Sequence, residues 1–200
     1  MILVGLTGVI GSGKSTVAAL LRKQEIPVID LDALAKESLR RTDVQAEIRA
    51  AFGDECVGPD GVDVARLRAT AFAQGKDLKR LEEVVHPRVR EEAARKLERL
   101  EAEGTPAVVV DHPLLFETGF YRRVDRIVVV STRLDTIRAR LVKRGMEPDD
   151  IERRIAFQIP LSEKETRADY VVRNDGTEQE LAAQVDLLVA RIAEWATKEV

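Results

Sequence analysis

The apolar positions of this chain fall into two alternating patterns. Five short segments predict strands: residues 2–6, 26–30, 107–111, 125–131 and 169–173. The first is a continuous apolar run, which is typical of a strand buried on both faces of a sheet. Most of the stretches between and after them are charged and have helical length, and in segment 15–23 the apolar residues Val17, Leu20 and Leu21 follow helical spacing. Strands that alternate with helices indicate an α/β fold, in which right-handed crossovers build a parallel sheet covered on both faces.

Two stretches break this alternation. The first runs from about residue 33 to residue 103 and holds four helix-like segments and no convincing strand. Its last segment predicts a charged helix over residues 82–103, with Pro87 close to the beginning, where a proline is tolerated. The second, residues 138–167, is helical and rich in charges of both signs. We therefore predict one sheet core made of residues 1–32, 104–137 and 168–200, with a helical insertion at 33–103 and a second helical excursion at 138–167.

Composition narrows the class of protein. The 200 residues are 44% hydrophobic and 34% charged, which is typical of a soluble globular chain, and no apolar run approaches the roughly 20 residues of a membrane span. The single cysteine, Cys56, excludes an internal disulfide and favours a reducing compartment, so we expect a cytoplasmic protein. Because 32 basic and 35 acidic residues nearly cancel, we do not expect nucleic acid as a partner. Since no apolar run is long enough to span a membrane, we expect no membrane partner either.

A glycine-rich turn with a fixed spacing follows the first predicted strand. Residues 8–15, GVIGSGKS, match G-x-x-x-x-G-K-[ST] at every fixed position, between a strand and a helix. Glycines lack a Cβ, so the backbone can wrap round a phosphate with its N–H groups pointing inward. In this pattern Lys14 reaches the β- and γ-phosphates, and the Ser15 hydroxyl is a ligand for Mg²⁺. The alternative is a chance turn with a solvated lysine, but the full pattern in this context favours a nucleoside triphosphate site.

Carboxylates follow two of the predicted strands. Asp30 and Asp32 lie at the end of the second strand, and Asp111 closes the third. Ligands of parallel sheets bind beyond the carboxyl ends of the strands. A carboxylate there can accept the proton of an attacking hydroxyl or hold Mg²⁺. The structural alternatives are a helix cap for Asp32 and strand-end solvation for Asp111. His112 is interpreted as a bystander, because this chemistry needs no histidine.

Two groups of arginines are candidates for binding anions. Arg88 and Arg90 follow the His86-Pro87 pair, and they either form a solvated helix face or clamp an anionic substrate. In the 138–167 excursion, Arg140 and Arg144 lie four residues apart on one predicted helix face. Arginines in a lid that closes over a kinase site would offset charge developing on the transferred group.

Together these motifs resemble one family. Residues 5–8 and 11–16 (GLTG, GSGKST), 28–32 (VIDLD), 86–90 (HPRVR), 113–117 (PLLFE), Gln158, 168–170 (ADY) and 174–176 (NDG) occur in the order found in dephospho-coenzyme A kinases. The glycine-rich turn is widespread, whereas Asp-x-Asp, His-Pro-x-x-Arg and Pro-Leu-Leu-Phe-Glu in this order are far more specific. The resemblance spans nearly the whole chain. Val9, Leu31 and His112 depart from it, since glycine, alanine and a small or aliphatic residue are usual there.

The resemblance implies ATP-dependent phosphorylation of the ribose 3′-hydroxyl of dephospho-CoA, with Mg²⁺. It implies a P-loop NTPase core with a five-stranded parallel sheet flanked by helices, a helical substrate-binding insertion and a helical lid at 138–167. The implied catalytic residues are Asp32 as base, Lys14 and Arg140. The implied ATP-binding residues are Gly8, Gly11, Ser12, Gly13, Lys14, Ser15 and Thr16. The implied acceptor residues are Asp32, His86, Arg90 and Leu115, and the implied metal ligands are Ser15 and Asp111.

Two other classes of protein share the glycine-rich turn. Kinases of nucleoside monophosphates or shikimate would not be expected to carry the 86–90 and 113–117 segments. A GTP-dependent switch would show Asn-Lys-x-Asp near a late strand, but residues 172–175 read VRND. We therefore expect a small-molecule kinase, a monomer or weak homo-oligomer, with dephospho-CoA as its substrate.

Overall fold

The computed structural model describes residues 1–73 and 77–198. The chain divides into two compact units. One, here called the sheet unit, comprises residues 1–29 and 100–200, and the other, the helical unit, comprises residues 30–99.

The sheet unit is built on five strands, so the predicted five-stranded parallel sheet is confirmed. The strands are β1 (Ile2–Thr7), β2 (Val28–Asp30), β5 (Ala107–Asp111), β6 (Arg126–Ser131) and β7 (Tyr170–Arg173), in the spatial order β2-β5-β1-β6-β7. β1 pairs in parallel with both β5 and β6, and Leu6 lies opposite Asp111. The last residues of β1 and β5 therefore meet at the same edge of the sheet, which is where ligands bind in such folds.

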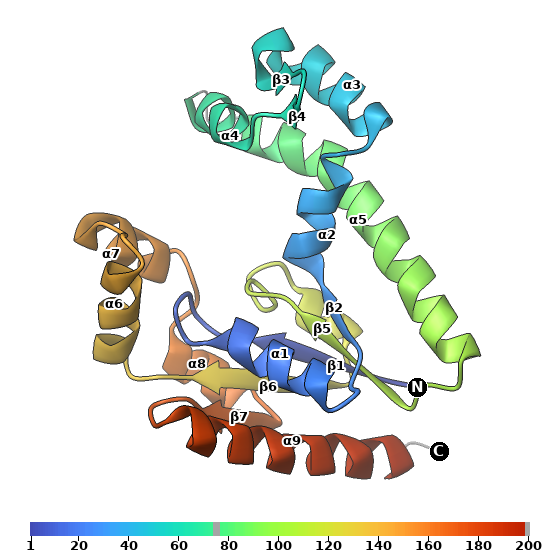
Figure 1. Ribbon diagram of the computed structural model, residues 1–200, viewed down its shortest axis with the longest axis vertical. Helices are drawn as coiled ribbons and strands as arrows, with labels where there is room; N and C mark the ends of the chain where they lie inside the picture. The colour runs from blue at the N-terminus through green and yellow to red at the C-terminus, as the bar shows by residue number, and fades with distance from the viewer. Residues whose placement is uncertain (74–76, 199–200) are drawn as a thin grey trace. The chain divides into compact units, whose positions relative to one another are not determined.

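Helices cover the sheet. On one face lie α1 (Lys14–Lys23) and the long α9 (Glu178–Lys198), as Figure 1 shows. Both turn an apolar stripe inward, and their buried residues join those of the strands in one core. The remaining elements of this unit are η2 (Phe120–Arg123), α6 (Leu134–Lys143), α7 (Pro148–Ala156) and α8 (Leu161–Thr166).

A second small core explains one departure from the family pattern. Val9, in the glycine-rich turn, is buried against Ile137 and Leu141 of α6 and Ile151 of α7. The bulkier side chain therefore contributes a contact between the turn and these helices, and it does not point into open space.

The helical unit has its own core. Its elements are α2 (Leu31–Ser38), α3 (Thr42–Phe52), η1 (Asp54–Cys56), β3 (Val57–Gly58), β4 (Gly61–Val62), α4 (Val64–Ala73) and α5 (Asp77–Ala102). Ile48 and Phe52 of α3 pack with Cys56, Leu67 of α4 and Val84 of α5. No helix within residues 1–73 and 77–198 is long and apolar enough to cross a membrane.

Two expectations for this segment are wrong. β3 and β4 form an antiparallel hairpin around Pro59 and Asp60, where no strand was expected. Each strand has only two residues, too few to show a period. The long helix begins at Asp77, so Pro87 lies in its interior and not near its start. A proline in a helix interior has no backbone N–H and therefore removes one helix hydrogen bond.

Candidate phosphate-binding site

The glycine-rich turn ends in a backbone conformation that only glycine adopts readily. Gly13 has φ 92° and is the N-terminal cap of α1. A Cβ added at Gly13 would collide with the side-chain amide of Asn174, and one at Gly8 would lie 2.7 Å from the carbonyl oxygen of Val130. The turn is therefore packed closely against the ends of β6 and β7, and it leads into the positive end of a ten-residue helix.

Side chains from two strand ends fix the turn. The carbonyl oxygen of Ser12 accepts a hydrogen bond from Thr132 Oγ1 at 2.8 Å and another from Asn174 Nδ2 at 2.8 Å. All three residues are buried. Because the acceptor is a backbone atom of the turn, these bonds hold the shape of the turn before any ligand arrives.

Lys14 is paired with a carboxylate at the sheet edge. Its Nζ donates to Oδ1 of Asp111, the last residue of β5. The side chain of Asp111 is almost fully buried, whereas that of Lys14 is 16% exposed. The predicted lysine and the predicted strand-end aspartate are thus brought together, so Asp111 does not simply end its strand in solvent.

Two buried polar groups at the turn have no hydrogen-bond partner in the part of the chain that the structure describes. Arg140, on α6, donates from Nη2 to the carbonyl oxygen of Asn174 at 3.0 Å, while its Nη1 is buried without a hydrogen-bond partner in the described residues. Ser12 Oγ is in the same situation within residues 1–73 and 77–198. Arg140 Nη1 would lie 3.7 Å from a Cβ at Gly13. A buried donor left unsatisfied costs about 1–3 kcal/mol, so such groups at the turn point to an anionic ligand.

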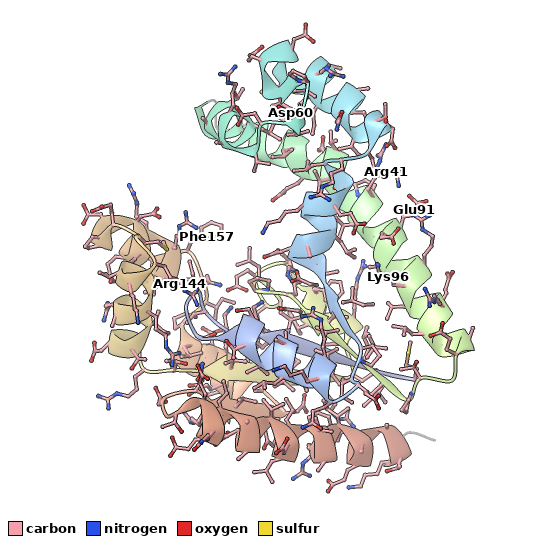
Figure 2. The ribbon with its side chains drawn as sticks, in the orientation of Figure 1. Arg41, Asp60, Glu91, Lys96, Arg144 and Phe157 are labelled. Carbon is pink, nitrogen blue, oxygen red and sulfur yellow. The ribbon has the colours of Figure 1, made fainter. Side chains whose placement is uncertain are left out.

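The other predicted residues of this unit take different positions. Ser15 and Thr16 are exposed in the first turn of α1. Leu115 is fully buried and would lie 3.1 Å from a Cβ at Gly5, so its side chain packs the core. Arg144 ends α6 and is exposed, as Figure 2 shows. Arg140 and Arg144 therefore differ, because only Arg140 is held at the glycine-rich turn.

A buried ion pair that the sequence did not predict joins α8 to the loop after β5. Lys164, on α8, has no exposed surface, and its Nζ donates to Glu117 Oε1 at 2.8 Å and to the Pro113 carbonyl oxygen at 3.2 Å. Burial lowers the pKa of Lys164, although the hydrogen bond to Glu117 acts in the opposite sense, and the nearby charge of Lys14 lowers it further. A lysine amid the charged positions of residues 161–166 gives no signal in the sequence that it is buried.

The partner carboxylate is stabilised in its charged form. Burial alone would raise the pKa of Glu117. The hydrogen bond from Lys164, together with those from the backbone N–H groups of Glu117 and Ile159, brings this pKa below its ordinary value. His112, in the same loop, contacts Thr118 Oγ1 at 3.0 Å and the edge of the Phe120 ring, which fits a structural role.

A cavity of about 530 Å³ also adjoins the turn, since Val9 lines it together with Gln158 and the segment 131–134. Its size falls in the range of small-molecule sites. Neither Lys14 nor Arg140 lines it, so these two candidate residues lie outside this cavity.

The helical unit carries the remaining candidates. The side chain of Asp30 accepts a hydrogen bond from the Ala33 N–H at 2.8 Å and is the N-cap of α2, so the cap suggested for Asp32 belongs to Asp30. Asp32 lies in the first turn of α2 and is exposed. His86 and Arg90 are exposed on α5, whereas Arg88 is partly buried and pairs with Glu47 and with Asp43.

Comparison with known proteins decides the family. The sequence model for dephospho-CoA kinase matches residues 2–180. The chain belongs to the dephospho-CoA kinase family. A dephospho-CoA kinase of Corynebacterium efficiens is 44% identical over 195 residues, which cover 96% of this chain and 98% of that one. Another from Geobacillus kaustophilus is 41% identical over 199 residues, with 98% of each chain covered.

Two solved structures share the fold of this chain. The TT1252 protein of Thermus thermophilus superposes with a TM-score of 0.82 at 39% identity, covering 95% of this chain and 97% of that one. A dephospho-CoA kinase of Campylobacter jejuni, 21% identical, shares the fold with a TM-score of 0.73 over 96% and 97% of the two chains. The chain is therefore a kinase that acts on a small molecule, in a family that uses ATP as phosphoryl donor for the last step of coenzyme A synthesis.

Proposed function

We propose that this kinase transfers the γ-phosphoryl group of ATP to the ribose 3′-hydroxyl of dephospho-CoA, with the glycine-rich turn as the phosphate cradle. The observation that carries the proposal is a pair of buried groups at the turn that have no hydrogen-bond partner among the described residues, Arg140 Nη1 and Ser12 Oγ. They lie in a chain whose family transfers phosphoryl groups. A triphosphate at the N-terminus of α1 would supply the missing acceptors.

The residues around the turn divide the work. The turn and first turn of α1 offer backbone N–H groups to the phosphates; the ATP-binding residues are Gly8, Gly11, Ser12, Gly13, Lys14, Ser15 and Thr16. Lys14 would exchange its contact with Asp111 for the β- and γ-phosphate oxygens. Arg140, already fixed by Asn174, would face charge that develops on the transferred group.

The donor set suits Mg²⁺. The Ser15 hydroxyl and the Asp111 carboxylate are oxygen ligands, which Mg²⁺ prefers. Within residues 1–73 and 77–198 there is no cluster of three or more His, Cys, Asp or Glu side chains that could hold a metal. This fits an ion held by few protein groups together with phosphates. When bound, Mg²⁺ neutralises charge on the β- and γ-phosphate oxygens.

The acceptor half of the reaction is assigned to the helical unit. Asp32, exposed in the first turn of α2, is the base that takes the proton of the ribose 3′-hydroxyl. His86 and Arg90, exposed on α5, would bind the acceptor, with Arg90 matched to its phosphate oxygens. Leu115 is left out, because its side chain is buried in the core. A cytoplasmic monomer or weak homo-oligomer stays a prediction.

The proposal is tested by acceptor choice. ADP release from ATP and Mg²⁺ is measured in a coupled assay with dephospho-CoA, AMP, CMP or shikimate as acceptor. We expect turnover with dephospho-CoA alone. Rapid turnover with one of the other three, with dephospho-CoA inert, would overturn the proposed substrate.

The cradle is tested separately with Lys14→Ala. We expect this variant to lose transfer, because the lysine charge is directed at the phosphates and the side chain is not part of the core. Circular dichroism should match that of the parent chain. A well-folded, active Lys14→Ala enzyme would refute the assignment of the cradle.

A further inference from the structure

The segment between α7 and α8 reaches back to the glycine-rich turn through one side chain. Gln158, half-buried, accepts a hydrogen bond from the backbone N–H of Ile10 through Oε1 at 2.8 Å. Its Nε2 donates to the carbonyl oxygen of Pro113 at 3.5 Å. Gln158 thus connects the turn after β1 with the loop after β5, although 148 residues separate it from Ile10.

The peptide unit that Gln158 holds is bonded at both ends. The unit between Val9 and Ile10 donates its N–H to Gln158, and its carbonyl oxygen, that of Val9, accepts from the Ser12 N–H at 3.1 Å. Removing either bond leaves a peptide that can rotate about its flanking ψ and φ angles. Rotation would turn the Val9 carbonyl away from Ser12, the residue whose own carbonyl anchors the turn.

Gln158 is itself held on a firm base. The next residue, Ile159, donates its N–H to Glu117 Oε1 at 2.9 Å, and Glu117 is paired with the buried Lys164. The Pro113 carbonyl that Gln158 contacts also accepts from Lys164 and from Thr7 Oγ1, at the end of β1, at 3.1 Å. Contacts of the neighbouring backbone and of Nε2 therefore restrict the position of the Gln158 side chain. A side chain held in this way can restrict the position of the Ile10 N–H.

We propose that Gln158 is a positioning residue for nucleotide binding, which holds the Val9–Ile10 peptide in the orientation that the phosphate cradle requires. This rests on the proposed function, since it deepens the role of the same site. Because Gln158 acts through the backbone of the turn and makes no charge contact with substrate, it should affect the nucleotide and not the acceptor.

The experiment replaces Gln158 with methionine, which has similar length and no amide. We expect the KM for ATP and the Kd for ADP, measured by calorimetry, each to rise about tenfold, with the KM for dephospho-CoA unchanged. Hydrogen exchange of the Ile10 amide should become at least about tenfold faster, because its acceptor is gone.

Gln45→Met is the matched control. Gln45 is also half-buried, and its Nε2 donates to the backbone carbonyl of Leu39 at 3.3 Å, but it lies in the helical unit. The Gln45→Met variant should have the same Kd for ADP as the parent chain. An equal weakening of ADP binding in both variants, or none in Gln158→Met, would overturn the proposal.

A third variant guards against misfolding. Gln158→Glu keeps an oxygen acceptor for Ile10, and so should keep the Ile10 amide protected; loss of that protection overturns the proposed contact. Neither ADP binding nor amide exchange requires a phosphoryl acceptor. Both can therefore be measured even if dephospho-CoA proves not to be the substrate. The two proposals therefore fail separately.

Discussion

Asp30 and Asp32 stand two residues apart but have different surroundings. The side-chain oxygen of Asp30 accepts a hydrogen bond from the Ala33 N–H and so caps α2. Asp32 follows in the first helical turn, exposed to solvent. A carboxylate that does not cap the helix is available to accept a proton, which is why Asp32 and not Asp30 is the base in the proposed reaction.

Asp32→Asn should therefore lower kcat by at least about 10²-fold with little change in melting temperature. Asparagine is a far poorer base than aspartate, and the helix keeps its cap at Asp30. Steady-state kinetics and thermal unfolding are the measurements, with Asp30→Asn as control, because asparagine caps a helix as well as aspartate. If Asp32→Asn keeps most of its kcat, no general base acts at this position.

Arg140 and Arg144 offer a second contrast at this scale. Arg140→Ala should lower kcat by roughly 10²-fold or more, and raise the KM for dephospho-CoA much less, because the charge that it faces develops in the transition state. Arg144→Ala, which removes an exposed arginine of the same helix, should stay near the parent kcat. An effect of Arg140→Ala confined to the KM for dephospho-CoA would place the residue in the acceptor site.

At the scale of the elements, α8 carries a buried charged residue, Lys164. Lys164 has 0% exposed surface and Glu117 lies at 2.8 Å. The folded chain holds the pKa of Glu117 below the ordinary value of 4.5. Its contribution to stability is therefore present above pH 4.5 and is lost as the pH falls through the lowered pKa.

Lys164→Met should lower the free energy of unfolding by about 3–5 kcal/mol at pH 7, since it leaves a partly buried carboxylate without its cation. Urea unfolding at pH 7 and pH 4 is the measurement. We expect the difference in the free energy of unfolding between the variant and the parent chain to be smaller at pH 4, where the unpaired carboxyl of Glu117 takes up a proton. The double change Lys164→Met with Glu117→Leu should recover much of the loss at pH 7. A difference that is the same at both pH values would contradict this account.

Some elements could be predicted from local sequence signals, whereas contacts between distant residues could not. The strand and turn around residues 2–15 could be predicted residue by residue, because a buried apolar run and a fixed glycine spacing are local signals. The resemblance also marked Gln158, but its partners, Ile10 and Pro113, are distant in the chain, and no local pattern shows them. The burial of Lys164 is likewise set by tertiary packing, which outweighs the usual exposure of lysine.

At the scale of the whole molecule, the groups assigned to the nucleotide phosphates all belong to the sheet unit. ADP at about 100 times its Kd should stabilise the chain by about 2.7 kcal/mol. In hydrogen exchange over seconds to minutes, protection should rise in residues 8–16 and at 131–132, while α3 and α4 stay unchanged. Dephospho-CoA should protect the helical unit instead. Equal protection of α3 and α4 by ADP would mean that nucleotide binding is not confined to the sheet unit.

Cys56, the single cysteine of the chain, is fully buried in the core of the helical unit. Its thiol donates to the Phe52 carbonyl at 3.4 Å, so a thiol reagent reaches it only when that core opens. The rate at which the native chain is modified, divided by the rate for the unfolded chain, is then the equilibrium constant for opening of the helical core. The chain thus carries a built-in reporter for one of its two units, and labelling it in the presence of each substrate would read the local response of that unit without any introduced probe.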